Sequence, residues 1–108
     1  MTNFEAISAE IYPYDVDENL LSKACIDNEV EKDGEYSLSQ KIGVAKAAIY
    51  VLRKLIVLAS ESNGGYALSY DVDELRKRIF SLAHEYGLSD IAEEFDSRSK
   101  ITDISNQW

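Results

Sequence analysis

Apolar residues recur at spacings of three and four along most of the chain, which is the period of an amphipathic helix. The longest such run covers residues 38–61 and carries two apolar stripes. The first stripe is Ile42, Ala45, Ile49, Leu52, Ile56 and Ala59, and the second is Ala48, Val51, Leu55 and Leu58. Only Lys46, Arg53 and Ser60 form a polar line. Because a helix that is apolar on most sides must be surrounded, we expect this segment, about 35 Å long, to be the axis of the domain.

Shorter helices are predicted around this axis, over residues 3–11, 17–27, 72–86 and 89–95. Pro13 ends the first, since proline disfavours helical geometry at the preceding residue. Asn63-Gly64-Gly65 ends the long helix and Gly87 ends the fourth, because these residues adopt the left-handed conformation that satisfies the last carbonyls. Residues 28–35 form a charged loop. Strand signals are weak throughout.

Helix starts are marked by four pairs at capping-box spacing, in which a side-chain acceptor is followed three residues later by Glu or Gln. The pairs are Thr2 with Glu5, Asp15 with Glu18, Ser37 with Gln40, and Asp71 with Glu74. The sequence therefore predicts an all-α fold, a compact bundle of four to five helices around the central helix. Residues 1–96 form a single domain, and residues 97–108 form an irregular tail because they show no sustained period.

The composition supports one small soluble domain: 108 residues, 45% of them apolar, bury enough surface for a core without a disulfide or metal. The formal net charge is -9, and ten of the twenty acidic residues lie in residues 1–36 beside only Lys23 and Lys32. An acidic surface repels phosphate backbones and anionic lipids, so we expect protein partners and neither nucleic acid nor membrane. The same charge could simply keep the domain in solution.

The N-terminus lacks the basic and apolar regions of a signal peptide, and Arg53 and Lys54 interrupt the long apolar segment, where each charge would cost about 2.5 to 3.5 kcal/mol in a bilayer. We therefore expect a cytoplasmic chain. No catalytic, cofactor-binding or metal-binding signature is present. Cys25 is expected in the core, and His84 is expected to face solvent without the partners that acid-base chemistry needs. Asp15 and Asp71 each begin an incomplete calcium loop: the first has Leu20 at the required glycine position, and the second already fails at Leu75. We predict that the protein is not an enzyme.

Two sets of residues are candidates for interaction surfaces. The basic set is Arg76, Lys77 and Arg78 with Arg53 and Lys54, which could meet the acidic third of a neighbouring copy or be satisfied by salt bridges within the chain. The aromatic set is Tyr12, Tyr14 and Trp108, which lie in loops or at ends, where aromatic side chains mark contacts or fold over helix ends. The sequence leaves both alternatives open.

The order of helices resembles that of small tailed-phage head-tail connector (adaptor) proteins. The resemblance is carried by residues 17–26, Asp-Glu-Asn-Leu-Leu-Ser-Lys-Ala-Cys-Ile, similar to that family's first helix, and by residues 42–50, similar to its central helix rich in small residues. It covers about residues 10–95. The family's extended lead into the first helix is replaced here by Tyr12-Pro13-Tyr14.

The resemblance implies a non-enzymatic virion part of a phage or prophage that forms a ring of identical subunits. The alternative is a small acidic helical adaptor or regulatory module that binds one cellular protein through its acidic third. The two differ in behaviour: a ring subunit assembles with a dependence on concentration and salt, whereas a binding module waits for its partner.

Overall fold

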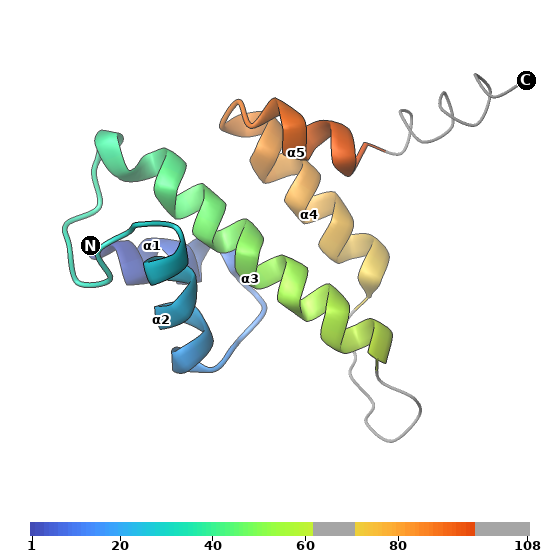
Figure 1. Cartoon of the computed structure of the whole chain (residues 1–108), viewed down its shortest axis with the longest axis horizontal. Helices are drawn as coiled ribbons and strands as arrows, with labels where there is room; N and C mark the ends of the chain where they lie inside the picture. Colours follow the sequence, from blue (N-terminus) through green and yellow to red (C-terminus); the bar gives the residue numbers. More distant parts are fainter. Residues whose placement is uncertain (62–70, 97–108) are drawn as a thin grey trace, which may run out of the picture.

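A computed structural model describes residues 1–61 and 71–96 (Figure 1). In chain order, its elements are α1 (Asn3–Ile11), α2 (Glu18–Asp27), a 3₁₀ turn (Leu38–Gln40), α3 (Lys41–Glu61), α4 (Val72–Glu85) and α5 (Ser89–Glu94). The all-α bundle is therefore confirmed. The predicted helix end at Asn63-Gly64-Gly65, the irregular tail and Trp108 lie outside the described residues.

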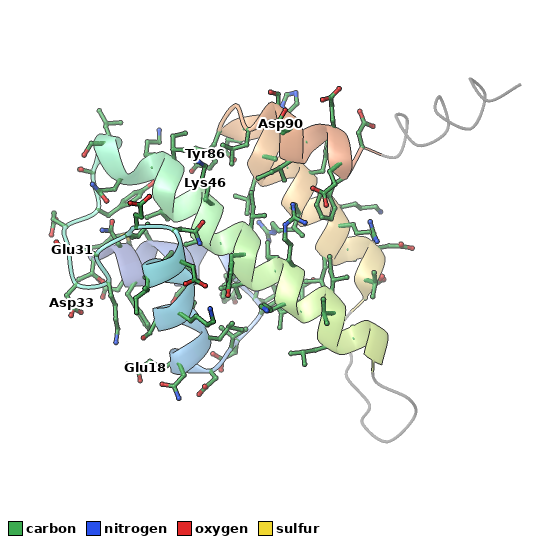
Figure 2. The ribbon with its side chains drawn as sticks, viewed as in Figure 1. Glu18, Glu31, Asp33, Lys46, Tyr86 and Asp90 are labelled. Atoms are coloured by element: carbon green, nitrogen blue, oxygen red, sulfur yellow. The ribbon has the colours of Figure 1, made fainter. Side chains whose placement is uncertain are left out.

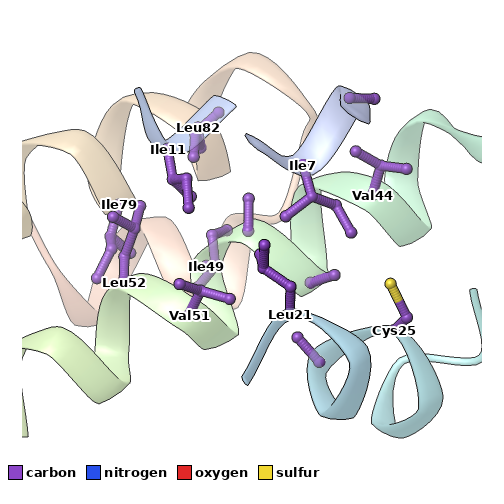
Figure 3. Packing of buried hydrophobic residues seen from close by; sticks show 14 of the residues in the cluster. Ile7, Ile11, Leu21, Cys25, Val44, Ile49, Val51, Leu52, Ile79 and Leu82 are labelled. Carbon is purple, nitrogen blue, oxygen red and sulfur yellow. The ribbon is translucent and has the colours of Figure 1, made fainter. Parts of the chain in front are cut away.

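The predicted role of the long helix as the axis is also confirmed, because α1, α2 and α4 all pack against α3 and α5 packs against α4. Alanines on α3 let the flanking helices approach closely, and Ala45, Ala47 and Ala48 are fully buried. Figure 3 shows the apolar side chains that meet around this helix. The larger members of the cluster are Ile7, Ile11, Leu21, Val44, Ile49, Val51, Leu52, Leu55, Leu75, Ile79 and Leu82.

Two of the four predicted helix caps are confirmed. The Thr2 hydroxyl accepts from the Glu5 amide at 3.2 Å while the Glu5 carboxylate accepts from the Thr2 amide at 2.8 Å. Asp71 accepts from the amides of Asp73 and Glu74 at 2.9 and 3.4 Å. These bonds satisfy amide donors that the first turn of a helix leaves free.

The other two predicted caps are wrong. The second helix begins at Glu18 with Asp17 before it and no side-chain cap, and the Glu18 carboxylate instead accepts from the Lys32 ammonium at 3.2 Å. Ser37 makes no cap bond either, because its hydroxyl pairs with that of Ser39 at 3.1 Å. The 3₁₀ turn therefore precedes α3, which begins three residues later than predicted.

Both α2 and α4 end in the same hydrogen-bonded motif, with a left-handed residue just beyond the helix. In α2 this residue is Glu29, at φ 57°, and the next amide, of Val30, donates to the Cys25 carbonyl at 2.8 Å. In α4 it is Gly87, at φ 72°, followed by a bond from Leu88 to Ala83 at 2.8 Å. Glycine adopts this conformation freely, whereas a residue with a Cβ atom is strained there.

We therefore expect Glu29→Gly to raise the free energy of unfolding by up to about 1 kcal/mol, because it removes the Cβ strain. Thermal and urea unfolding measure the change. The matched control is Gly87→Ala. A Cβ atom at this position would have no neighbouring described atom within 4 Å, so the substitution should lower the free energy of unfolding by about 1 kcal/mol through backbone strain alone. A lower midpoint for Glu29→Gly than for the wild type would contradict this interpretation.

The predicted charged loop is held firmly against α1. The Asn3 and Phe4 amides donate to the carbonyls of Gly34 and Lys32 at 2.9 and 3.1 Å, and Thr2 and Glu35 form an isolated antiparallel bridge. Val30 is buried in the core. The loop is thus a fixed part of the surface.

Candidate protein interface

The acidic segment, residues 27–35, presents five exposed carboxylates at one end of the molecule. They are Asp27, Glu29, Glu31, Asp33 and Glu35. Figure 2 labels Glu31 and Asp33 beside the first turn of α1. A shallow hollow of about 280 Å³ is lined by residues 31–34.

The buried side-chain amide of Asn3 is hydrogen-bonded to this segment. Asn3 is 1% exposed, and its side-chain Nδ2 donates to the Glu31 carbonyl at 2.9 Å. Its Oδ1 has no hydrogen-bond partner among the residues that the structure describes. Because polar groups are buried at a cost unless they are bonded, this one donated bond ties the position of the loop to α1. No local sequence pattern predicts this bond, since Asn3 and Glu31 are far apart in the chain.

Only part of the charge in the acidic segment is neutralised within the chain. Asp27 pairs with Lys23, and the N-terminal amine lies 3.5 Å from Glu35. The pKa of the Asp27 carboxyl is lowered, chiefly by its hydrogen bond with Lys23. Among residues 1–61 and 71–96, no ion pair holds Glu29, Glu31 or Asp33. Three exposed carboxylates are therefore left to solvent.

The outward side of α3 carries a second distinctive surface, which we call the α3 strip. It consists of Ile42, Lys46, Tyr50, Lys54 and Val57, which fall within about a third of the helix circumference at 100° per residue. Ile42 is 42% exposed and Val57 49%, and both lysines are exposed. The Tyr50 ring lies between two ammonium groups, with Lys23 and Lys54 at 5.7 and 5.6 Å from its centroid. The strip is therefore apolar and basic.

The predicted basic set is distributed among separate contacts. Arg53 reaches across to α5, where its two terminal nitrogens donate to the Glu94 carboxylate at 2.8 Å each. Arg53 and Arg76 also lie over the Phe95 ring, at 5.0 and 5.7 Å from its centroid. This cluster fastens α5, which has no fully buried residue, to α3 and α4.

The two remaining α4 bases point elsewhere. Arg78 donates to the Tyr12 carbonyl at 2.9 Å and so ties α4 to the end of α1. Lys77 is exposed and lies 3.5 Å from Glu74 of its own helix. Of the predicted aromatic set, Tyr12 is exposed, whereas Tyr14 is half-buried and packs against the core. The consecutive bases on α4 thus do not form one patch.

The ion pair between Arg53 and Glu94 predicts a pH dependence of stability. The Arg53 guanidinium lowers the pKa of the Glu94 carboxyl, so the native state gains stability above the unfolded pKa and loses it as the pH falls through the folded value. We expect Glu94→Gln to lower the melting temperature slightly at neutral pH, since both side chains are partly exposed and such pairs contribute little.

Once the pH falls below the lowered folded pKa and the carboxyl is protonated, the variant and the wild type should unfold at the same temperature. Glu93→Gln is the control, because Glu93 is exposed and makes no ion pair with any described residue. Thermal unfolding by circular dichroism measures both. Equal effects of the two substitutions at neutral pH would show that the pair contributes nothing specific.

The other titratable groups that the sequence singled out lie where expected. Cys25 is buried, and burial raises the pKa of its thiol, which leaves it unreactive. His84 is exposed and its ring packs near that of Phe80. Tyr86, which the sequence did not single out, donates its hydroxyl to Glu10 at 2.8 Å, and this bond raises its pKa.

The described residues offer neither a metal site nor a membrane-spanning helix. Residues 1–61 and 71–96 contain no group of three or more His, Cys, Asp or Glu side chains placed to hold a metal ion. In the same ranges, no helix combines the length and apolar character needed to cross a bilayer.

Fold and surface together define a small all-α bundle with an exposed acidic segment and an apolar, basic strip on α3. The whole chain, residues 1–108, matches the family of unknown function DUF6706, and the protein belongs to that family. No curated protein and no solved structure matches the chain.

Proposed function

We propose that the protein is a non-enzymatic structural subunit of the head-tail connector type, which assembles head to tail with copies of itself in a phage or prophage particle. The observation that carries the proposal is that the acidic segment and the lysines of the α3 strip occupy different surfaces of the chain. The acidic segment precedes the start of α3 (Figure 1), whereas the exposed Lys46 and Lys54 lie on α3 itself. The resemblance of residues 17–26 and 42–50 to connector proteins supports this type of subunit.

Charge separation favours one mode of self-association. In a two-fold contact both copies use the same surface, so opposite charges can meet there only if the acidic and the basic residues both lie within that one surface. In a head-to-tail contact the acidic surface of one copy meets a basic surface of the next. Such a contact repeats, and it closes into a ring when the rotation between neighbours permits.

Negative-stain electron microscopy of concentrated protein at low ionic strength tests the proposal. We expect closed rings of uniform diameter that disperse when salt screens the contacts. Open filaments would support head-to-tail contact but contradict a ring-forming connector. Fields without particles at any concentration would contradict self-assembly altogether.

A second candidate function is an adaptor module that binds one cellular protein through its acidic third. It is favoured by Glu29, Glu31 and Asp33, which are exposed and make no ion pair within the described ranges. A solution monomer that forms a defined complex only when a basic partner is added would support this candidate over the first.

A further inference from the structure

We propose that the α3 strip is the surface that receives the acidic segment of a neighbouring copy. This inference rests on the proposed self-assembly and specifies which basic surface takes part. The sequence predicted a basic set on α4 with Arg53 and Lys54, whereas the contacts of the folded chain favour Lys54 with Lys46, both on α3.

First, the α3 strip carries positive charges that have few partners within the described part of the chain. Lys46 is exposed and has no ion pair among residues 1–61 and 71–96. The Lys54 ammonium lies over the Tyr50 ring and forms no salt bridge within those ranges, although its charge helps to lower the pKa of the Asp27 carboxyl of the same chain. Two turns and a fraction separate the two lysines, about 12 Å along the helix, so they can meet two different carboxylates. In contrast, Arg53 and Arg78 already donate to Glu94 and to the Tyr12 carbonyl.

Second, the α3 strip combines this positive charge with exposed apolar surface. Ile42 and Val57 are each close to half exposed and lie on the same side of α3 as Lys46. The acidic segment has a matching feature, since Ile26 is 75% exposed and immediately precedes Asp27. Protein interfaces usually combine buried apolar contact with polar and charged contacts, and both surfaces offer the two kinds of group.

Third, charge complementarity favours the acidic segment of another copy as the partner that binds to the α3 strip. If two α3 strips paired with each other, Lys46 and Lys54 would face lysines, which is unfavourable. The acidic segment of another copy has the opposite charge, and its Glu29 and Glu31 are exposed and without ion pairs in the described part of the chain. It is also held in place by Asn3 and the bonds to α1, so little entropy is lost when it docks.

A charge-exchange experiment tests the assignment. One variant carries Lys46→Glu and Lys54→Glu, and the other carries Glu29→Lys and Glu31→Lys. We expect each variant alone to self-associate at least tenfold more weakly than the wild type, measured by sedimentation velocity. An equal mixture should recover assembly, because each strip then meets a segment of opposite charge. Circular dichroism confirms that both variants are folded.

The matched control is Lys77→Glu, which reverses an exposed base on α4 outside the strip. It should change self-association less than twofold. If it weakens assembly as much as the strip variant does, or if the mixture stays monomeric while the wild type assembles, the assignment to the strip is wrong and the proposed self-assembly stands.

Two further outcomes would overturn the inference in other ways. A wild type that stays monomeric throughout would remove the proposed function and this contact with it. If the strip variant assembles normally but loses binding to heparin, used as a model polyanion, the strip serves a different anionic partner.

Discussion

Replacing Leu52 by alanine is expected to lower the free energy of unfolding by about 2–5 kcal/mol, the range measured when a fully buried leucine is truncated. Leu52 lies on α3 and has no exposed surface. It belongs to the one cluster that joins α1, α2, α3 and α4, so no single helix can move to fill the space left behind. Because small domains are stable by only about 5–15 kcal/mol, this change removes a large part of the total.

Urea unfolding followed by circular dichroism measures this loss. The control is Leu38→Ala, since Leu38 is 82% exposed and its truncation should fall within about 0.5 kcal/mol of the wild type. Similar losses for the two variants would mean that α3 is not the axis on which the core is built.

The second large effect is expected for Asn3→Asp. The change preserves shape but replaces the Nδ2 donor with an oxygen that faces the Glu31 carbonyl, in a position only 1% exposed. Burying a carboxylate without a partner costs about 3–5 kcal/mol. We therefore expect the variant to be strongly destabilised at neutral pH, with the acidic segment released from α1.

The pH dependence of this variant's stability distinguishes the cost of burying a charge from the cost of losing packing contacts. Burial raises the folded pKa of the introduced carboxyl, so the native state loses stability as the pH rises from the unfolded to the folded value. Below that window the protonated group can again donate to the Glu31 carbonyl, and the difference from the wild type should shrink. Asn3→Ala is the control and should lose about 1–3 kcal/mol with little pH dependence. A pH-independent loss for Asn3→Asp would contradict this account.

The spacing of apolar residues along the chain was sufficient to predict the helices, because it shows which side of each segment is buried. The first helix was predicted with its observed bounds, and Pro13 and Gly87 act as expected at helix ends. The failures at Asp15 and Ser37 have a common cause: spacing shows that a cap is available, but competing partners decide whether it forms. Glu18 is bound by Lys32, and such a contact between distant residues is not visible in local sequence.

The candidate interface was predicted only in part for the same reason. The acidic segment follows directly from composition, since five of its nine residues are acidic. The basic surface does not, because the consecutive bases on α4 diverge around the helix and two of the basic residues are taken by distant partners. Glu94 lies 41 residues from Arg53 in the chain, and the Tyr12 carbonyl 66 residues from Arg78. Lys54 was already in the predicted basic set, whereas Lys46 stands out only once these pairings are known.

The most direct test of self-assembly is the mass of the wild-type protein, measured by light scattering behind size exclusion across a range of concentrations at about 0.05 M and about 0.5 M salt. We predict a mass of several subunits that grows with concentration at low salt and falls toward that of one chain at high salt. A mass of one chain at every concentration and both salt levels would contradict the account.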